Sequence, residues 1–163
     1  MNVEGAPEGF PEYQVKAKLL IRMAEFVDWP EGTFPSPEAP FIIAIAGKDP
    51  FGSYLENLVT KEKIKDHPIL LTHFASDAEP GRCHMLFIAK TEVSRLDRIL
   101  SRIDGSPVLI VSDTEAMNRK GVHISFHMSE GRMRFQINLG SAKKSRLVIT
   151  SQLLRLATKI LEG

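Results

Sequence analysis

Residues 41–60 read FIIAIAGKDPFGSYLENLVT: an unbroken apolar run, a turn containing glycine and proline, and a segment long enough for a helix. The run from Phe41 to Ala46 has no polar residue, which is typical of a strand covered on both faces of a parallel sheet. Residues 53–60 are expected to form the helix that follows it. A strand that leads directly into a helix is the repeating unit of α/β folds, so this stretch predicts the fold class.

Three more apolar runs are expected to be strands of the same sheet: 69–74, 85–89 and 108–112. A second helix is expected over 94–103, with Ser94 as its N-cap. After Gly121 the residues alternate in character, and Glu130-Gly131 suits a tight turn between two antiparallel strands. The sequence therefore predicts a three-layer α/β sandwich, with a mostly parallel, doubly wound sheet of about six strands that ends in an antiparallel hairpin.

A helix is expected near each end of the chain. In the first, apolar residues recur at helical spacing: Val15, Leu19, Leu20, Met23, Phe26 and Val27. The opposite, polar face is expected to carry Lys16, Lys18, Arg22 and Glu25, and Pro30 and Gly32 end the helix. The last helix is expected to begin at Ser151 and to run to Glu162. Residues 1–11 are expected to be a flexible leader, and 12–163 a single domain.

Composition excludes several classes of function. The 163 residues contain 21 Lys and Arg against 20 Asp and Glu, so the net charge is +1 and nucleic acid is not an expected partner. No apolar run reaches the roughly 20 residues of a membrane-spanning helix, so membrane insertion is not expected. Met1 to Phe10 show none of the features of a secretory signal. Cys83 is the one cysteine, which excludes an intramolecular disulfide.

The exits of the expected strands are the first place to look for a binding site, because ligands bind beyond the carboxyl ends of parallel strands. After the first strand, Gly47, Lys48 and Gly52 can present backbone amides and a positive charge to an anion. The other interpretation is a simple strand-to-helix turn in which Asp49 caps the helix. The turn is not a P-loop, because no Lys-Ser/Thr pair follows its second glycine.

Two further exits carry polar residues, Lys90 after one strand and Ser112 with Asp113 after another. Together with Asp49 they are expected to form a small polar cluster that binds a ligand, or to serve as caps and turn residues. Trp29 follows the first helix, where it either packs the helix end onto the sheet or contacts a partner.

No catalytic or metal-binding pattern is present. His123 and His127 face the same way on an expected strand but lack further ligands, so no metal site is expected. Gly140-Ser141 does not continue as a nucleophile elbow. Cys83 is expected to be a small buried hydrophobic residue. The chain is therefore expected to have no cofactor and not to be an enzyme.

Six stretches, in this order, resemble the YfiR-like family: EFVDWP (25–30), GKDPFG (47–52), CHMLFI (83–88), PVLIVSD (107–113), EGRMRFQINL (130–139) and SQLLRLA (151–157). The resemblance begins at Tyr13 and covers nearly the whole remaining chain. It implies a periplasmic, non-catalytic protein, secreted by a signal peptide that is removed, which binds the periplasmic sensor region of an inner-membrane diguanylate cyclase. Such binding represses the cyclase and lowers cyclic-di-GMP output and biofilm formation.

The resemblance also implies that the protein can pair with itself as a homodimer. A redox switch between two cysteines of this chain is excluded, because only Cys83 is present. On this interpretation the contact surfaces are the first helix with Trp29 and the strand exits. The alternative is a periplasmic module that binds a small anionic metabolite at the Gly47 to Gly52 turn.

Overall fold

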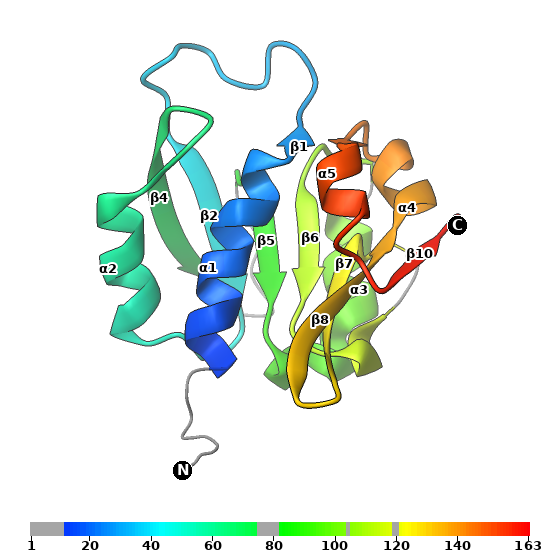
Figure 1. Ribbon diagram of the computed structural model, residues 1–163. Helices are drawn as coiled ribbons and strands as arrows, with labels where there is room; N and C mark the ends of the chain where they lie inside the picture. The colour runs from blue at the N-terminus through cyan, green and yellow to red at the C-terminus, as the bar shows by residue number, and fades with distance from the viewer. Residues whose placement is uncertain (1–11, 75–81, 104, 119–120) are drawn as a thin grey trace.

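The computed structural model describes residues 12–74, 82–103, 105–118 and 121–163 (Figure 1). The helical elements are α1 (Glu12–Glu25), α2 (Ser53–Lys61), η1 (Lys90–Arg95), α3 (Leu96–Arg102), η2 (Glu115–Met117), α4 (Leu139–Lys144) and α5 (Ser151–Leu154). The strands are β1 (Val27–Asp28), β2 (Phe41–Ala46), β3 (Lys63–Ile64), β4 (His67–Phe74), β5 (Met85–Ile88), β6 (Leu109–Ser112), β7 (Ile124–Ser129), β8 (Arg132–Asn138), β9 (Val148–Ile149) and β10 (Lys159–Leu161).

The main sheet has eight strands in the order β10-β8-β7-β6-β5-β2-β4-β3. Its centre, from β4 to β7, is parallel, and β7 pairs with β8 as an antiparallel hairpin. The helices α1 and α2 lie on one face and α3 lies on the other, which gives three layers (Figure 1). The predicted α/β sandwich with a mostly parallel sheet and a hairpin is confirmed, with β3 and β10 as short additional edge strands.

Each face of the sheet has its own apolar core. Ile43, Ile45 and Phe87 point towards α1 and α2, whereas Ala44 and Leu86 point towards α3. Because both faces are covered, neither side of β2 or β5 needs polar residues, which explains their continuous apolar sequences. Among the described residues, no helix is long and apolar enough to cross a membrane.

The prediction of a C-terminal helix from Ser151 to Glu162 is wrong about where the helix ends. The helix α5 stops at Leu154, and the chain then forms β10, which pairs in parallel with β8. Leu156 and Ile160, which the helical pattern placed on the buried stripe, are 61% and 41% exposed. The backbone of Glu162 instead lies against Gly140, so closely that a side chain at position 140 would displace it. Strand pairing and this close approach therefore override the local helical periodicity.

Two other local predictions are corrected. The segment around Ser94 is the 3₁₀-helix η1, and α3 begins only at Leu96, so Ser94 is not its N-cap. The helix α1 ends at Glu25, before Pro30, because β1 follows at once and pairs with β9. The leader predicted over 1–11 lies outside the described residues.

Two histidines complete the parallel ladders in the same way. His84 precedes β5, donates its backbone N–H to the Ile42 carbonyl and accepts the Ile42 N–H at Nδ1, 2.9 Å away. His123 precedes β7 and makes the same pair of bonds with Ile110, again with 2.9 Å from the backbone nitrogen to Nδ1. Each ring must stay neutral at Nδ1 to accept a backbone N–H. These histidines therefore act as structural acceptors at strand starts.

Burial lowers the pKa of both rings from 6.5 to about 4, and for His84 the charges of Arg82 and His67 lower it further. An unfolded histidine has a pKa near 6.5, so between about pH 6.5 and 4 the unfolded chain binds protons that the folded chain does not. Stability contributed by the neutral rings is fully present above that range and is lost as the pH falls through it.

We expect the urea midpoint to fall steadily between pH 7 and pH 4.5. For His123 alone the loss at acid pH is on the order of 3 kcal/mol. His123→Asn retains an acceptor for the Ile110 N–H and does not titrate, so it should flatten part of the pH dependence, and His84→Asn should flatten another part. Slopes identical to that of the original chain in both variants would contradict this account.

Candidate functional site

A buried ion pair marks the carboxyl end of the sheet, where the first turn of α1 meets the exit of β6. Lys16 on α1 is 2% exposed, and its Nζ donates to Asp113 Oδ1 at 2.7 Å, to the Asp113 carbonyl at 3.0 Å and to Glu12 Oε2 at 2.9 Å. These three bonds use all three N–H donors of the ammonium group. The Lys16 charge is thus fully paired although it lies in the core.

The second oxygen of Asp113 ties in two more segments. Oδ2 accepts the Tyr13 hydroxyl at 3.1 Å and the backbone N–H of Lys90, at the exit of β5, at 3.2 Å. Burial, and then the charge of Asp113, raise the pKa of the Tyr13 hydroxyl, so it remains a donor at neutral pH. One carboxylate therefore holds α1, the β5 exit and the β6 exit together.

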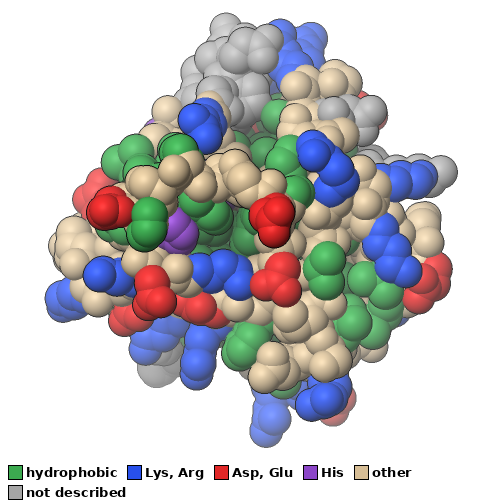
Figure 2. Space-filling view, turned by 90° about the horizontal axis from the view of Figure 1, so that it is seen from above, with side chains coloured by type: hydrophobic (Ala, Val, Ile, Leu, Met, Phe, Trp, Pro, Cys, Tyr) green, Lys and Arg blue, Asp and Glu red, His purple; other side chains and the backbone are tan. Residues whose placement is uncertain are grey.

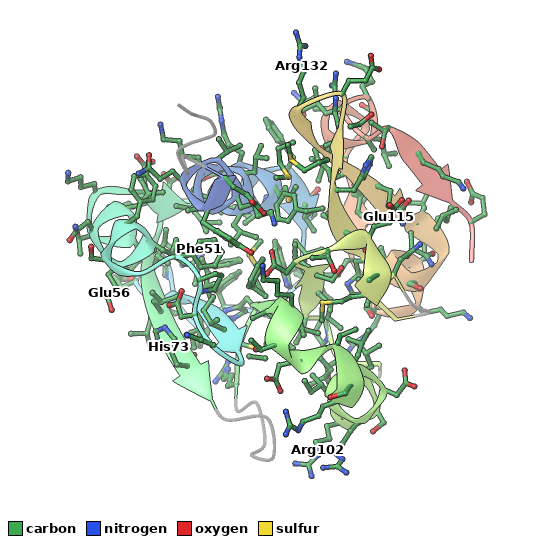
Figure 3. The ribbon with its side chains drawn as sticks, turned by 90° about the horizontal axis from the view of Figure 1, so that it is seen from below. Phe51, Glu56, His73, Arg102, Glu115 and Arg132 are labelled. Carbon is green, nitrogen blue, oxygen red and sulfur yellow. The ribbon has the colours of Figure 1, made fainter. Side chains whose placement is uncertain are left out.

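A groove of about 270 Å³ opens beside this pair, between the start of α1 and the tip of the β7–β8 hairpin. Its floor includes Lys16, Asp113 and Phe126. Its walls include Glu12, Glu115, His127, Met128 and Met133. Figure 3 looks onto this end of the molecule, with Glu115 near the hairpin and Phe51 on the α2 side. The groove thus offers carboxylates and exposed thioether surface to the outside.

The Gly47 to Gly52 turn is built around a close approach. Gly47 has φ +90°, and a side-chain carbon there would lie 2.6 Å from Glu92 Cγ and from Thr91 Oγ1. Thr91 Oγ1 accepts the Lys48 backbone N–H at 3.2 Å, which joins the exits of β2 and β5. The Lys48 side chain is exposed. Only glycine fits at position 47, on grounds of both conformation and space.

One interpretation of the sequence made Asp49 the cap of α2, and the structure shows that it is not. The N-cap is Gly52, at φ 59°, and Asp49 Oδ1 accepts the Phe51 N–H at 2.7 Å in a turn before the helix. Asp49 Oδ2 lies 2.6 Å from Nε2 of His73, near the end of β4. Asp49 therefore faces the outer edge of the sheet, away from Asp113.

The structure divides the remaining site residues predicted from the sequence. The backbone N–H of Lys90 donates to the side-chain carboxylate of Asp113. The Ser112 hydroxyl lies elsewhere, 2.9 Å from the Ser125 hydroxyl and 3.2 Å from the Thr114 carbonyl. Trp29 lies at the opposite end of the molecule and packs edge-on against Phe41, with 5.1 Å between ring centroids. Trp29 thus has the packing contact that one interpretation expected, and because it is only half-buried, its contact with a partner stays a prediction.

The amino end of the sheet, where Trp29 lies, is an aromatic cluster. Phe34 stacks between the rings of His67 and His84, with centroids 4.0 and 4.5 Å apart, and Phe41 lies beneath. Figure 2 looks onto this end and shows apolar and histidine side chains around a hollow. The stack fixes the loop between β1 and β2 over the strand starts.

The other residues considered for chemistry have structural roles. His123 accepts a backbone N–H at Nδ1, so its Nε2 carries the proton and donates to Ser145 Oγ at 3.1 Å, which rules it out as a base for that serine. Cys83 is buried, and burial raises the pKa of its thiol to about 12, so it is protonated and a poor nucleophile at neutral pH. Among the described residues, no three His, Cys, Asp or Glu side chains form a group that could hold a metal ion.

Lys16 is the residue that the sequence analysis placed wrongly, on the polar face of the first helix. The spacing contained the signal: positions 16, 20 and 23 lie on one helical stripe, and Leu20 and Met23 are both fully buried. Val15, which had been counted as apolar face, is 40% exposed. A lysine on a buried stripe is a sign that an acidic partner lies opposite.

We expect Lys16→Met to lower the free energy of unfolding by about 3–5 kcal/mol, because it leaves the Asp113 carboxylate buried without a counter-ion. Lys18→Met, at an exposed position on the same helix, should change it by less than about 0.5 kcal/mol. Urea denaturation measures both variants. Equal stability of the two variants would show that the buried pair does not hold α1 in place.

A glycine pair separates steric crowding from backbone strain at the turn after β2. Gly32→Ala, at φ +86° with open space around it, should cost about 1–2 kcal/mol from conformation alone. Gly47→Ala, at φ +90°, should cost about 2–5 kcal/mol, because the new methyl group also meets Glu92 and Thr91. Thermal unfolding compares them, and equal losses would refute the close packing of the two strand exits.

Comparison with known proteins agrees with this architecture. No curated protein matches the sequence at a significant level. A solved structure described as the ABC domain in complex with L-Trp, from Streptococcus pneumonia, has a TM-score of 0.60 and 12% identity, with 93% of this chain and 62% of that chain covered. The chain therefore spans less than two thirds of that structure, and the likeness concerns the fold. A family model described as YfiR/HmsC-like matches residues 13–158, so the chain belongs to the YfiR/HmsC-like family.

Proposed function

We propose that this protein is a non-catalytic periplasmic regulator that binds the periplasmic sensor region of an inner-membrane diguanylate cyclase and represses it. The observation that carries the proposal is the family match over residues 13–158, from the first turn of α1 to the start of β10. Membership of this family supports a regulator rather than an enzyme, in line with the cyclic-di-GMP signalling that the resemblance to YfiR-like proteins implies. The match extends over both cores of the fold.

The chemistry of the strand exits supports a binding role. Lys16 and Asp113 form hydrogen bonds with each other. Their remaining bonds are also within the protein, to Glu12, Tyr13 and the Lys90 backbone. A catalytic group needs a free lone pair or proton directed at a substrate, and these groups direct theirs inward. Their role is to make the carboxyl end of the sheet rigid, which suits a surface that a partner recognises.

We place the partner contact on the groove at the carboxyl end of the sheet, with the strand exits Gly47, Lys48, Lys90 and Asp113 as its support. The exposed features there are the carboxylates of Glu12 and Glu115 and the thioether of Met128, which is 57% exposed. Methionine surface adapts to varied partners, and carboxylates at the rim favour basic ones. The partner is therefore expected to present a basic and apolar segment.

The test uses cells that produce a membrane diguanylate cyclase together with this chain. Crosslinking and purification of the chain should recover the cyclase, and cyclic-di-GMP should fall when the chain is produced. Glu115→Lys reverses an exposed charge at the groove and should weaken recovery about tenfold, with higher cyclic-di-GMP. Glu56→Lys makes the same change on the far flank, as Figure 3 shows, and should behave like the original chain.

Two results would refute the proposal. Recovery of no inner-membrane signalling protein under any condition would remove the cyclase as partner. Recovery unchanged by Glu115→Lys but lost with Glu56→Lys would place the contact on α2 instead of the groove.

A second candidate is a periplasmic module that binds a small ligand. It is supported by the fold likeness to a domain solved with L-Trp, and by the exposed Lys48 beside the Gly47 to Gly52 turn. This candidate differs from the first in one measurable respect. A ligand that binds only the folded chain, such as phosphate or L-Trp, raises its melting temperature with no partner protein present.

A further inference from the structure

A second crevice lies between α3 and α4, away from the Lys16–Asp113 pair. It encloses about 330 Å³. The inner wall is apolar, with Ile103 and Ile110 nearly fully buried and Leu100 beside them. The opposite wall is α4 and its C-cap: Ser141 and Lys144 lie on the helix, and Ser145 caps it. The crevice thus sets an apolar surface against a polar one.

The two serines are buried polar groups in the wall of this cavity, 7% and 8% exposed. Each hydroxyl oxygen already accepts a hydrogen bond from the protein. Ser141 Oγ accepts the Gly121 backbone N–H at 3.1 Å, and Ser145 Oγ accepts Nε2–H of His123 at 3.1 Å. The direction of the second bond is fixed, because Nδ1 of the same ring accepts the Ile110 N–H.

This hydrogen-bond pattern decides what the serines can offer to a ligand. A hydroxyl whose oxygen accepts from the protein keeps its own O–H to donate. Within the described part of the chain, neither serine donates that hydrogen to a protein acceptor. Two O–H donors therefore remain for whatever enters the crevice, and a donor pair of this kind suits an oxyanion better than a cation or an amide N–H.

The charged residues at the mouth support the same chemistry. Lys144 directly precedes Ser145 in the sequence. It lines the crevice and is exposed to solvent. Asp97, on α3, is exposed as well, so water screens the charges of both Lys144 and Asp97, and the buried hydroxyl donors inside the cavity carry more weight than either. The anionic group of a ligand is thus favoured on the α4 side, with its apolar body against α3 and β6.

We propose that the crevice between α3 and α4 binds a small organic carboxylate, with its oxygens on Ser141, Ser145 and Lys144 and its apolar body on Leu100, Ile103 and Ile110. This site is separate from the groove at the carboxyl end of the sheet and from the Gly47 to Gly52 turn. Since α4 also carries Gly140, against which the backbone of Glu162 packs just after β10, a bound ligand contacts the helix that supports this edge.

The test titrates the full chain with 4-methylpentanoate and with two probes of the same shape, 4-methylpentan-1-ol and 4-methylpentylamine. Backbone amide NMR signals should shift at Gly121 and at 141–145 with the carboxylate. The alcohol and the amine should bind at least about tenfold more weakly, because they lack the anion that the donors require.

Two lysines give a matched pair of variants. Lys144→Gln should weaken carboxylate binding about fivefold, whereas Lys143→Gln, an exposed neighbour that does not line the crevice, should leave it unchanged. Ser145→Ala removes one O–H donor and should weaken binding about tenfold, with the NMR spectrum showing that the fold is intact. Equal binding of carboxylate and alcohol, shifts confined to other regions, or equal effects of the two lysine variants would overturn the proposal.

Discussion

The buried pair between Lys16 and Asp113 is the constraint on which the arrangement of the layers depends. A lysine in a core is stable only with a full set of acceptors, and here every donor of the ammonium has one. Because Tyr13 and Lys16 both bind Asp113, the start of α1 cannot shift without breaking its bonds to the β6 exit, which Asp113 also ties to the Lys90 backbone at the β5 exit. The position of the first helix is thereby fixed by electrostatics as well as by apolar packing, and with it one wall of the groove at the carboxyl end.

The two ends of the parallel sheet are stabilised by different chemistry. At the carboxyl end the bonds involve charge, whereas at the strand starts neutral imidazole rings accept the backbone N–H groups of Ile42 and Ile110. The second of these rings also donates its Nε2–H to the hydroxyl oxygen of Ser145, a residue that lines the crevice beside α4. A structural device at one strand start thus determines the hydrogen-bonding character of a cavity, which links the interior of the sheet to a candidate ligand site.

Most of the central architecture could be predicted from local sequence. The run from Phe41 to Ala46 and the runs around Met85 and Leu109 can only be buried strands, and the turn at Glu130-Gly131 forms the expected hairpin. The candidate site was predicted less completely. Lys90 and Asp113 do come together, but Asp49 faces His73 instead, and Lys16 was assigned to solvent because its residue type outweighed its position on the buried stripe.

The sequence by itself determined the fold class, the order of the strands along the chain and the absence of an intramolecular disulfide, because apolar patterning and cysteine count are local properties. Tertiary structure alone decided that the segment after Leu154 becomes the edge strand β10, and that Asp113 is the partner of the buried Lys16. It also decided that Ser141 on α4 and Ser145 at its C-cap each keep a free donor. These outcomes depend on partners far away in sequence, namely β8, Asp113, Gly121 and His123, and no local pattern encodes which distant groups will meet.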